Sequence, residues 1–203
     1  MAISIGINGF GRIGRVALRI AISQPDTFKL CGINVRNADL DYMKYMVRYD
    51  STFGRFQGEL DTYEQGLIIN GQKIPVFSES DASLIPWDSC GAEYIIDATG
   101  AYCTTQKAMD HLQGGAKKVI ISAPAKDEET PTFIMGVNHT EYNSDMPVVS
   151  NASCTTNCLA PICKILEDNY GIEYGLMSTI HAATAKQKVD DSRSQKDWRT
   201  GRS

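Results

Sequence analysis

A cysteine at the start of a predicted helix is the residue of this sequence best suited to covalent chemistry. Cys154 lies where a polar loop gives way to a helical pattern of apolar residues that runs to about Asp168. The first turn of a helix offers unpaired backbone N–H groups and the positive end of the helix dipole, and both favour the nucleophilic thiolate. Cys158 and Cys163, further along this helix, are expected to be small core residues. Because the C-x3-C-x4-C spacing lacks a CxxC pair, no metal site is predicted.

A cysteine nucleophile needs a base, and the sequence offers three histidines. His111 is expected near the C-terminal end of an amphipathic helix, in a solvated position, and His139 lies in a loop. The segment from Tyr174 to His181 predicts a strand whose last residue would face a cleft. His181 is therefore the candidate base.

A glycine-rich loop precedes the first predicted helix. Gly9, Gly11 and Gly14 match the pattern GxGxxG between a strand predicted over 3–8 and a helix predicted over 13–23. Small residues there let the backbone approach a pyrophosphate, which the N–H groups of the helix N-terminus bind. The motif in this position predicts a dinucleotide site. The helix is expected to bury the face formed by Ile13, Val16, Ala17, Ile20 and Ala21.

The acidic residue that usually follows such a loop and binds the adenosine ribose is missing. The strand predicted over 29–34 is followed by Val35 and Arg36, and a valine cannot accept hydrogen bonds from ribose hydroxyls. Loss of the carboxylate also removes repulsion against a 2′-phosphate, which the Arg36 guanidinium could bind. This pattern favours NADP. In the alternative, Arg36 is a solvated charge and Asp39 reaches the ribose.

The elements that must position these residues alternate between strand and helix through the first 150 residues. This alternation is typical of a parallel sheet with flanking helices, and it predicts an α/β fold. A β-hairpin around Asn70 and Gly71 is expected as an insertion on that sheet, and a helix is expected to open near Asp39 or Asp41. The other predicted elements are strands over 94–97, 119–122 and 148–150 and a helix through Ala108, Met109 and Leu112.

Composition excludes several classes of function. The chain has 203 residues, a formal charge of −4 and 42% hydrophobic residues, which excludes intrinsic disorder and gives no basic footprint for nucleic acid. No window approaches the roughly 18 apolar residues of a membrane span. Because the N-terminus enters a strand without a signal-peptide pattern, we expect a cytoplasmic protein whose six cysteines are free thiols.

Five segments of the sequence are distinctive: GINGFGRIG (6–14), YDST (49–52), ISAP (121–124), SNASCTTNCLAP (150–161) and KDWR (196–199). Together they resemble the phosphorylating glyceraldehyde-3-phosphate dehydrogenase family. The resemblance covers the chain end to end, and its most specific segment surrounds Cys154. It implies a Rossmann-type dinucleotide-binding domain over residues 1–150 and the incomplete start of an α+β catalytic domain over residues 151–203.

The resemblance implies an oxidoreductase of glycolysis that turns glyceraldehyde 3-phosphate, inorganic phosphate and a nicotinamide cofactor into 1,3-bisphosphoglycerate. Cys154 matches the nucleophile, which forms a hemithioacetal and then a thioester, and His181 matches its base. Ser153 and Thr155 match the site of the attacking phosphate, and Thr184 matches that of the substrate's own phosphate. The residues matched to the cofactor, NAD or NADP, are Gly9, Gly11, Arg12, Ile13, Gly14, Asn34, Arg36, Thr99, Gly100, Ser122 and Arg193.

Some positions depart from the family pattern. Val35 stands where most NAD-using members carry the ribose-binding aspartate. Ser192 and Arg193 replace a Gly-Pro pair in a loop that, in family tetramers, approaches the ribose of a neighbouring subunit. Both changes favour NADP, and the resemblance implies that the protein is a homotetramer. Lys186 replaces a threonine near the substrate-phosphate pocket, and its role stays open.

Length is a further departure. The rest of the family's catalytic sheet, a phosphate-binding arginine, the asparagine that orients the carboxamide and the C-terminal helix have no counterpart in the 203 residues. The chain alone is therefore expected to be inactive. Two alternatives stay open: an erythrose-4-phosphate dehydrogenase, which shares the cysteine motif, and a non-catalytic dinucleotide-binding fragment.

Overall fold

The chain divides into two units, residues 1–165 and residues 166–203. The computed structural model describes residues 2–182 and 184. Helix α6 (Cys154–Tyr170) runs across the division between the units. The domain boundary predicted at residue 150 stays a prediction.

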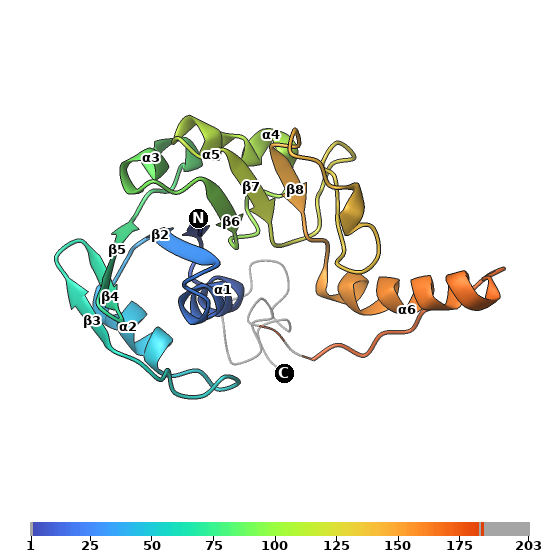
Figure 1. Ribbon diagram of the computed structural model, residues 1–203, viewed down its shortest axis with the longest axis horizontal. Coiled ribbons are helices and arrows are strands. Elements are labelled where there is room, and N and C mark those ends of the chain that lie inside the picture. The colour runs from blue at the N-terminus through green and yellow to red at the C-terminus, as the bar shows by residue number, and fades with distance from the viewer. Residues whose placement is uncertain (1, 183, 185–203) are drawn as a thin grey trace, which may run out of the picture. The chain divides into compact units, whose positions relative to one another are not determined.

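Within the described residues, the first unit holds an eight-stranded sheet in the order β3-β4-β5-β2-β1-β6-β7-β8 (Figure 1). The strands from β5 to β8 in that order are mutually parallel. Taken in chain order, the parallel strands are arranged 3-2-1-4-5-6, the order of a doubly wound dinucleotide-binding sheet that reverses between β1 and β6. The predicted α/β class is confirmed. The parallel strands are β1 (Ile3–Asn8), β2 (Phe28–Asn34), β5 (Gln72–Phe77), β6 (Tyr94–Asp97), β7 (Lys118–Ile121) and β8 (Val148–Ser150).

Two clusters of buried apolar residues cover the two faces of this sheet in the described part of the chain. Leu18 and Ala21 of α1 (Arg12–Ser23) and Met43 and Val47 of α2 (Leu40–Arg48) belong to the first cluster. Trp87 belongs to the second cluster. The short helices on that side, α3, α4 and α5, lie across the sheet from α1 and α2 (Figure 1). They span Trp87–Cys90, Thr105–Ala108 and Asp110–Gln113, and the 3-10 turns η1 and η2 span Ala82–Leu84 and His139–Glu141.

The helix predicted after the glycine loop is confirmed, but its predicted buried face is only partly right: Ala21 is buried and Ala17 packs against the core, whereas the two isoleucines are not buried. Ile13 and Ile20 are about half exposed, whereas Gly14, Leu18 and Ala21 are buried. Positions 14, 18 and 21 follow the i, i+4, i+7 spacing of one helix face. The face is centred on Leu18 because its side chain, unlike those of the two isoleucines, packs into the core over β1 and β2.

The predicted hairpin is confirmed as β4 (Gly66–Ile69) and β5, but it is not an insertion. Asn70 and Gly71 both have positive φ, 50° and 79°, as the primed turn of a two-residue hairpin requires. β5 also pairs in parallel with β2, so the hairpin extends the main sheet. β3 (Leu60–Tyr63), which pairs with β4, was not predicted, because its sequence LDTY lacks apolar alternation.

Three further expectations meet different outcomes. Asp39 caps α2 by accepting a hydrogen bond from the Tyr42 N–H at 3.0 Å, which confirms the predicted start of that helix. The helix predicted through Ala108 and Leu112 is two short helices that separate at Met109. The strand predicted over 174–181 is wrong: no strand forms there in the described residues. A strand persists only where a neighbouring strand completes its backbone hydrogen bonds, and apolar pattern alone does not supply that neighbour.

No described helix is both long and apolar enough to cross a membrane.

Candidate functional site

The carboxyl ends of β1, β2 and β6 surround a cleft of about 370 Å³ at the point where the strand order reverses. Doubly wound sheets bind their ligands at this position. Of the predicted cofactor residues, Gly9, Asn34, Arg36 and Thr99 line the cleft, as does Val35. The other lining residues, which the sequence analysis missed, are Asn8, Asn37, Glu79, Ser80, Ala101 and Tyr102.

The three glycines of the loop differ in what surrounds them. A Cβ on Gly14 would lie 2.0 Å from the Gly9 carbonyl oxygen, so Gly14 is required for the close packing of α1 on β1. Gly9 has φ of +100°, and a Cβ there would lie 2.9 Å from the carbonyl carbon of Ala98. Among the described residues, nothing lies within 4 Å of a Cβ on Gly11. The protein's own packing thus needs Gly9 and Gly14, whereas Gly11 leaves open space where a pyrophosphate can approach the backbone.

The start of α1 presents positive charge beside this loop. In the described structure, no side chain caps α1 at Gly11 and its first turn holds no acidic residue, so an anion could take the place of a cap. The Arg12 Nη1 donates to Asp50 Oδ2 at 2.6 Å. Hydrogen bonds from the backbone N–H groups of Phe53 and Thr52 and from Arg12 lower the pKa of Asp50 to about 2. Asp50 is thereby kept ionised and orients Arg12 as a cation beside the glycine loop.

Where the cleft meets the end of β2, the position predicted for the ribose, it is lined by Val35 and Arg36 and by no carboxylate of that segment. Val35 packs against the first core cluster and its N–H donates to the Phe77 carbonyl at 3.0 Å. Arg36 is exposed and lines the cleft. Asp39 caps α2 and is not among the described residues that line the cleft. Its position therefore weighs against the alternative in which Asp39 binds the ribose. The acidic residue that does line the cleft is Glu79, after β5.

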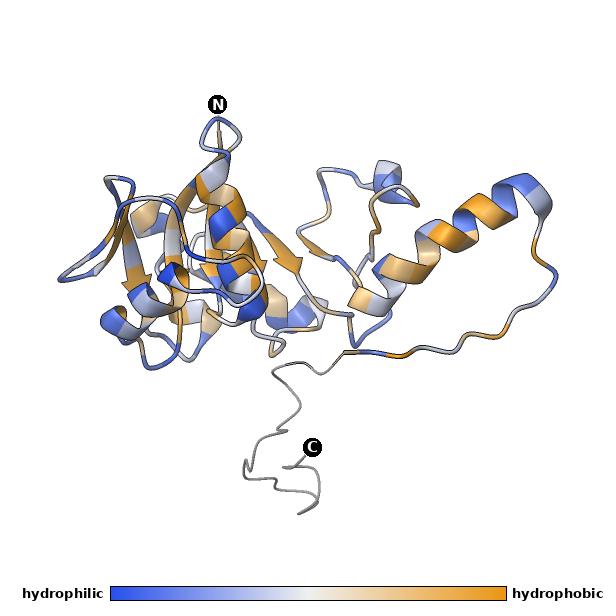
Figure 2. Cartoon of the chain, turned by 90° about the horizontal axis from the view of Figure 1, so that it is seen from below, coloured by the Kyte–Doolittle hydropathy of each residue, from blue (hydrophilic) through white to orange (hydrophobic). Residues whose placement is uncertain are grey.

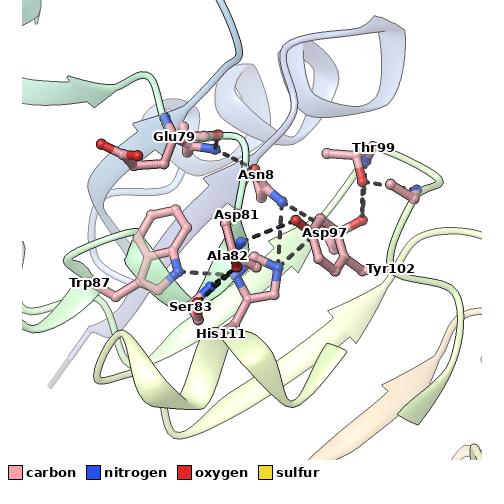
Figure 3. A network of polar contacts seen from close by, with 12 residues as sticks. Asn8, Glu79, Asp81, Ala82, Ser83, Trp87, Asp97, Thr99, Tyr102 and His111 are labelled. Carbon is pink, nitrogen blue, oxygen red and sulfur yellow. Dashed lines mark hydrogen bonds and ion pairs between the residues drawn. The ribbon is translucent and has the colours of Figure 1, made fainter. Parts of the chain in front are cut away.

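A chain of buried polar side chains starts at Asn34 and Asn8, which line the cleft, and continues to residues behind it (Figure 3). Asn34 Nδ2 donates to Asn8 Oδ1 at 2.8 Å, and Asn8 Nδ2 donates to Asp97 Oδ2 at 2.7 Å. His111 Nε2 lies 3.3 Å from the same carboxylate oxygen, and Trp87 Nε1 donates to His111 Nδ1 at 3.1 Å. His111 is fully buried, so the solvated position predicted for it is wrong. The predicted place near the C-terminal end of a helix is confirmed, but helix periodicity does not reveal polar partners such as Trp87 and Asp97 that lie far away in the sequence.

Two predicted cofactor residues lie next to this chain and, in the described structure, do not line the cleft. The Ser122 N–H donates to the Asp97 carbonyl at 3.0 Å, immediately after β7. Gly100 follows Thr99 with φ of +70°. Their contacts with a cofactor stay predictions.

Cys154 is the first residue of α6, and its side chain is exposed. Ser153 caps the helix: the Thr156 N–H donates to Ser153 Oγ at 3.0 Å. Asn157 Nδ2 donates to the carbonyl of Asn151 at 2.7 Å and to that of Ser153 at 2.9 Å, which holds the turn before the helix. The predicted helix and the position of Cys154 in its first turn are confirmed. Ser153 has a structural role as well as the phosphate contact predicted for it.

The remainder of α6 differs from expectation. Cys158 is exposed and Cys163 is only partly buried, so neither is the core residue predicted. In the described structure, α6 has no buried residue, and Leu159, Ile162 and Ile165 expose a large share of their surface. Apolar residues recur along the length of the helix (Figure 2). A helix face becomes core only when another element covers it.

The predicted base lies in the other unit. His181 is exposed, and its Nδ1 lies 2.7 Å from the Ala182 carbonyl oxygen. Thr184 is exposed as well. Lys186, Ser192 and Arg193 lie outside the described residues. The pairing of His181 with Cys154 stays a prediction.

A doubly wound sheet with a glycine loop, an uncapped helix start and a cleft at its switch point defines a dinucleotide-binding protein. The family comparison is more specific. Residues 3–105 match the glyceraldehyde 3-phosphate dehydrogenase NAD binding domain, and residues 153–203 match the C-terminal domain of the same enzyme. This chain belongs to the glyceraldehyde 3-phosphate dehydrogenase family.

Individual relatives agree with the family assignment. The chain is 56% identical to the glyceraldehyde-3-phosphate dehydrogenase of Aspergillus oryzae over 198 residues, which cover 98% of the chain and 58% of the relative. It is 54% identical to the enzyme of the same name from Aspergillus niger, over 100% of the chain and 59% of the relative. It is 53% identical to the cytosolic enzyme of Gracilaria gracilis, over 98% and 58%. The chain thus spans a little under three fifths of the length of these relatives.

Proposed function

We propose that this protein is part of a phosphorylating glyceraldehyde-3-phosphate dehydrogenase that uses Cys154 as its nucleophile. The observation that carries the proposal is the exposed Cys154 thiol on the first turn of a capped helix, in a chain whose sheet forms a dinucleotide cleft. The helix dipole and the backbone N–H groups of that turn favour the thiolate. Inorganic phosphate and an aldehyde phosphate are the proposed substrates.

The proposed reaction has two stages at Cys154. The thiolate adds to the aldehyde carbon, and backbone N–H groups of the helix start stabilise the oxyanion of the hemithioacetal. His181, which has accepted the thiol proton of Cys154, donates that proton to the oxyanion and accepts it again as the carbon loses its hydride. The nicotinamide cofactor, when bound, supplies the hydride acceptor. Phosphate bound by Ser153 and Thr155 then attacks the resulting thioester, and the acyl phosphate leaves as the Cys154 thiolate is regenerated. Thr184 would hold the phosphate that the substrate already carries.

The residues of the cleft fit a dinucleotide. Gly11 and the start of α1 would receive the pyrophosphate with Arg12 and Ile13. Gly9, Asn34 and Thr99 line the cleft beside it, and Gly14 lets α1 pack closely against Gly9. Gly100 and Ser122 are proposed on the nicotinamide side. We further propose that NADP is preferred, because Val35 offers no acceptor to the ribose and the exposed Arg36 lines the cleft beside it. Arg193 is proposed to add a second cation from a neighbouring subunit of a cytoplasmic homotetramer.

The nucleophile is tested by comparing two exposed cysteines of the same helix, Cys154 and Cys158. Iodoacetamide should alkylate Cys154 at neutral pH at least about tenfold faster than Cys158, as peptide mass mapping would measure. Equal rates would contradict activation by the helix start.

Turnover is tested on a chimera that joins residues 1–203 to the remaining part of the Aspergillus oryzae relative. Cys154→Ser should abolish reduction of the cofactor there and Cys158→Ser should not, whereas activity retained in Cys154→Ser excludes the thioester route. Assaying erythrose 4-phosphate beside glyceraldehyde 3-phosphate identifies the preferred aldehyde.

The cofactor preference is tested in the same chimera. Val35→Asp combined with Arg193→Pro should shift the ratio of kcat/KM for NADP and NAD toward NAD by about tenfold or more. Arg36→Ala should weaken NADP more than NAD. An unchanged ratio in both variants refutes the proposed preference. If Glu79→Gln weakens NAD alone, Glu79 is the ribose acceptor and the preference for NADP fails.

A further inference from the structure

A buried carboxylate next to the cleft has no part in the chemistry proposed above. Asp97, the last residue of β6, is 1% exposed and is not a lining residue of the cleft. Thr99, two residues later, does line it. We propose that Asp97 is a positioning residue that holds Thr99 in the geometry that binds the dinucleotide. This inference rests on the dinucleotide binding proposed above.

The two oxygens of Asp97 serve different neighbours. Oδ1 accepts from the Thr99 hydroxyl at 2.8 Å and from the Thr99 N–H at 3.2 Å, so it fixes both the side chain and the backbone of that residue. The Thr99 Oγ1 in turn accepts from the Ala101 N–H at 3.0 Å. Oδ2 accepts from Asn8 Nδ2 at 2.7 Å. One carboxylate thus fixes the loop from Thr99 to Ala101, both ends of which line the cleft.

Trp87 determines how His111 completes this arrangement. The Trp87 indole can only donate, and it donates to His111 Nδ1, so that nitrogen must be unprotonated. The ring proton then lies on His111 Nε2, which faces Asp97 Oδ2 at 3.3 Å (Figure 3). In this geometry His111 Nε2 donates to Asp97, whose two oxygens each face two donors. An asparagine amide has only one acceptor oxygen, so Asn at position 97 could not accept all of these hydrogen bonds.

The opposite wall of the cleft is held by the same chain of side chains. Asn34, whose Nδ2 donates to Asn8, also exchanges two hydrogen bonds with the Glu79 backbone, at 2.9 Å and 3.0 Å. Tyr102, in the loop after β6, accepts from the Ala82 N–H at 3.0 Å and donates to the Ser80 carbonyl at 3.1 Å. The two loops that meet at the cleft are therefore tied to each other and to Asp97 before any ligand binds. Such preorganisation lowers the cost of ordering the site on binding.

The test is a double-variant cycle in the 203-residue chain, with the Kd for NADP and NAD measured by titration calorimetry. Asp97→Asn leaves one acceptor oxygen for two pairs of donors and should raise the Kd about tenfold. Thr99→Val should do the same, and Thr99→Ser should recover most of the loss because the hydroxyl returns. The double variant Asp97→Asn/Thr99→Val should bind about as weakly as either single variant, since Asp97 acts through Thr99.

Asp127 provides a matched control. Its Oδ1 accepts from the hydroxyl and the N–H of Thr130, just as Asp97 Oδ1 accepts from those of Thr99. Neither Asp127 nor Thr130 lines the cleft in the described residues. Asp127→Asn should leave the Kd within about twofold. Three results would each overturn the inference. The Kd could stay unchanged in Asp97→Asn, or the two fold-changes in Kd could multiply in the double variant. Asp127→Asn could also weaken binding as much as Asp97→Asn does. If Asp97→Asn does not fold, equal affinities of Thr99→Val and Thr99→Ser overturn it. Wild-type chain that binds neither dinucleotide overturns the proposed dinucleotide binding as well, whereas tight wild-type binding with unaffected variants overturns this inference alone.

Discussion

The cleft at the strand ends and the helix that carries Cys154 are built in opposite ways. The cleft rests on side chains such as Asp97 and His111 that are buried and hydrogen-bonded to one another. Helix α6 has none of its described residues buried, although apolar residues recur along it. The first region is organised by contacts within this chain, whereas the second has its local geometry from a cap and lacks a covering layer in the described residues. We infer that a dinucleotide site can form here independently of the nucleophile's surroundings.

The largest expected effect separates the glycines that the fold needs from the one that a ligand needs. Gly14→Ala places a Cβ 2.0 Å from a backbone oxygen and should lower the free energy of unfolding by more than about 3 kcal/mol. Gly11→Ala meets nothing within 4 Å in the described structure and should change stability by less than about 1 kcal/mol, while weakening dinucleotide binding. Urea denaturation and calorimetric titration measure the two quantities. Binding that survives Gly11→Ala at full affinity would break the assignment of that space to the pyrophosphate.

Isoleucine occurs both in the sheet below the cleft and on helix α6, so one residue type can be compared in the two regions. Ile95 is fully buried in β6, whereas Ile162 on α6 is 53% exposed. Ile95→Ala should cost about 3 kcal/mol because it leaves a cavity, and Ile162→Ala should change stability by less than about 0.5 kcal/mol. Urea denaturation of the 203-residue chain measures both. A comparable loss in the two variants would mean that α6 is covered in solution, for example by a second copy of the chain.

The smallest prediction concerns the ion pair beside the glycine loop. The pKa of Asp50 falls from 3.8 to about 2 on folding, so ionised Asp50 stabilises the fold above pH 3.8, and this contribution is lost as the pH falls toward 2. Asp50→Asn should therefore cost of order 1 kcal/mol at neutral pH and flatten the acid end of the stability profile. Thermal unfolding from pH 2 to pH 7 would show the difference between wild type and variant shrinking below pH 4.

Asp61 is the matched control for that profile. Its pKa is also lowered, chiefly by a hydrogen bond from Lys44, but the pair is exposed on the surface. Solvent screens such pairs, so Asp61→Asn should leave the profile close to that of the wild type. An equal change in both variants would show that Asp50 is no more important than a surface charge, and Arg12 would then lack the anchor described above.

Much of the fold could be predicted from local pattern. The glycine loop, the buried β1 and the Asn70–Gly71 turn are written in a few adjacent residues, since turn geometry and helix starts depend on local backbone preferences. The misses share a cause. Local pattern predicts β5 as part of an insertion and does not predict the burial of His111, because the pairing of β5 with β2 and the contacts of His111 involve partners far away in the sequence.

The sequence alone establishes three features: a cysteine at a predicted helix start, a glycine loop after a predicted strand, and Val35 in place of an acidic residue. These depend on residue identity and short spacing. The surroundings of the cleft follow from the tertiary structure, in which Asn8, Asp97 and His111 meet although as many as 103 positions separate them. Such a network forms only when a sheet brings strand ends together, because a buried carboxylate is tolerated where several donors converge on it, and that convergence is a property of the fold.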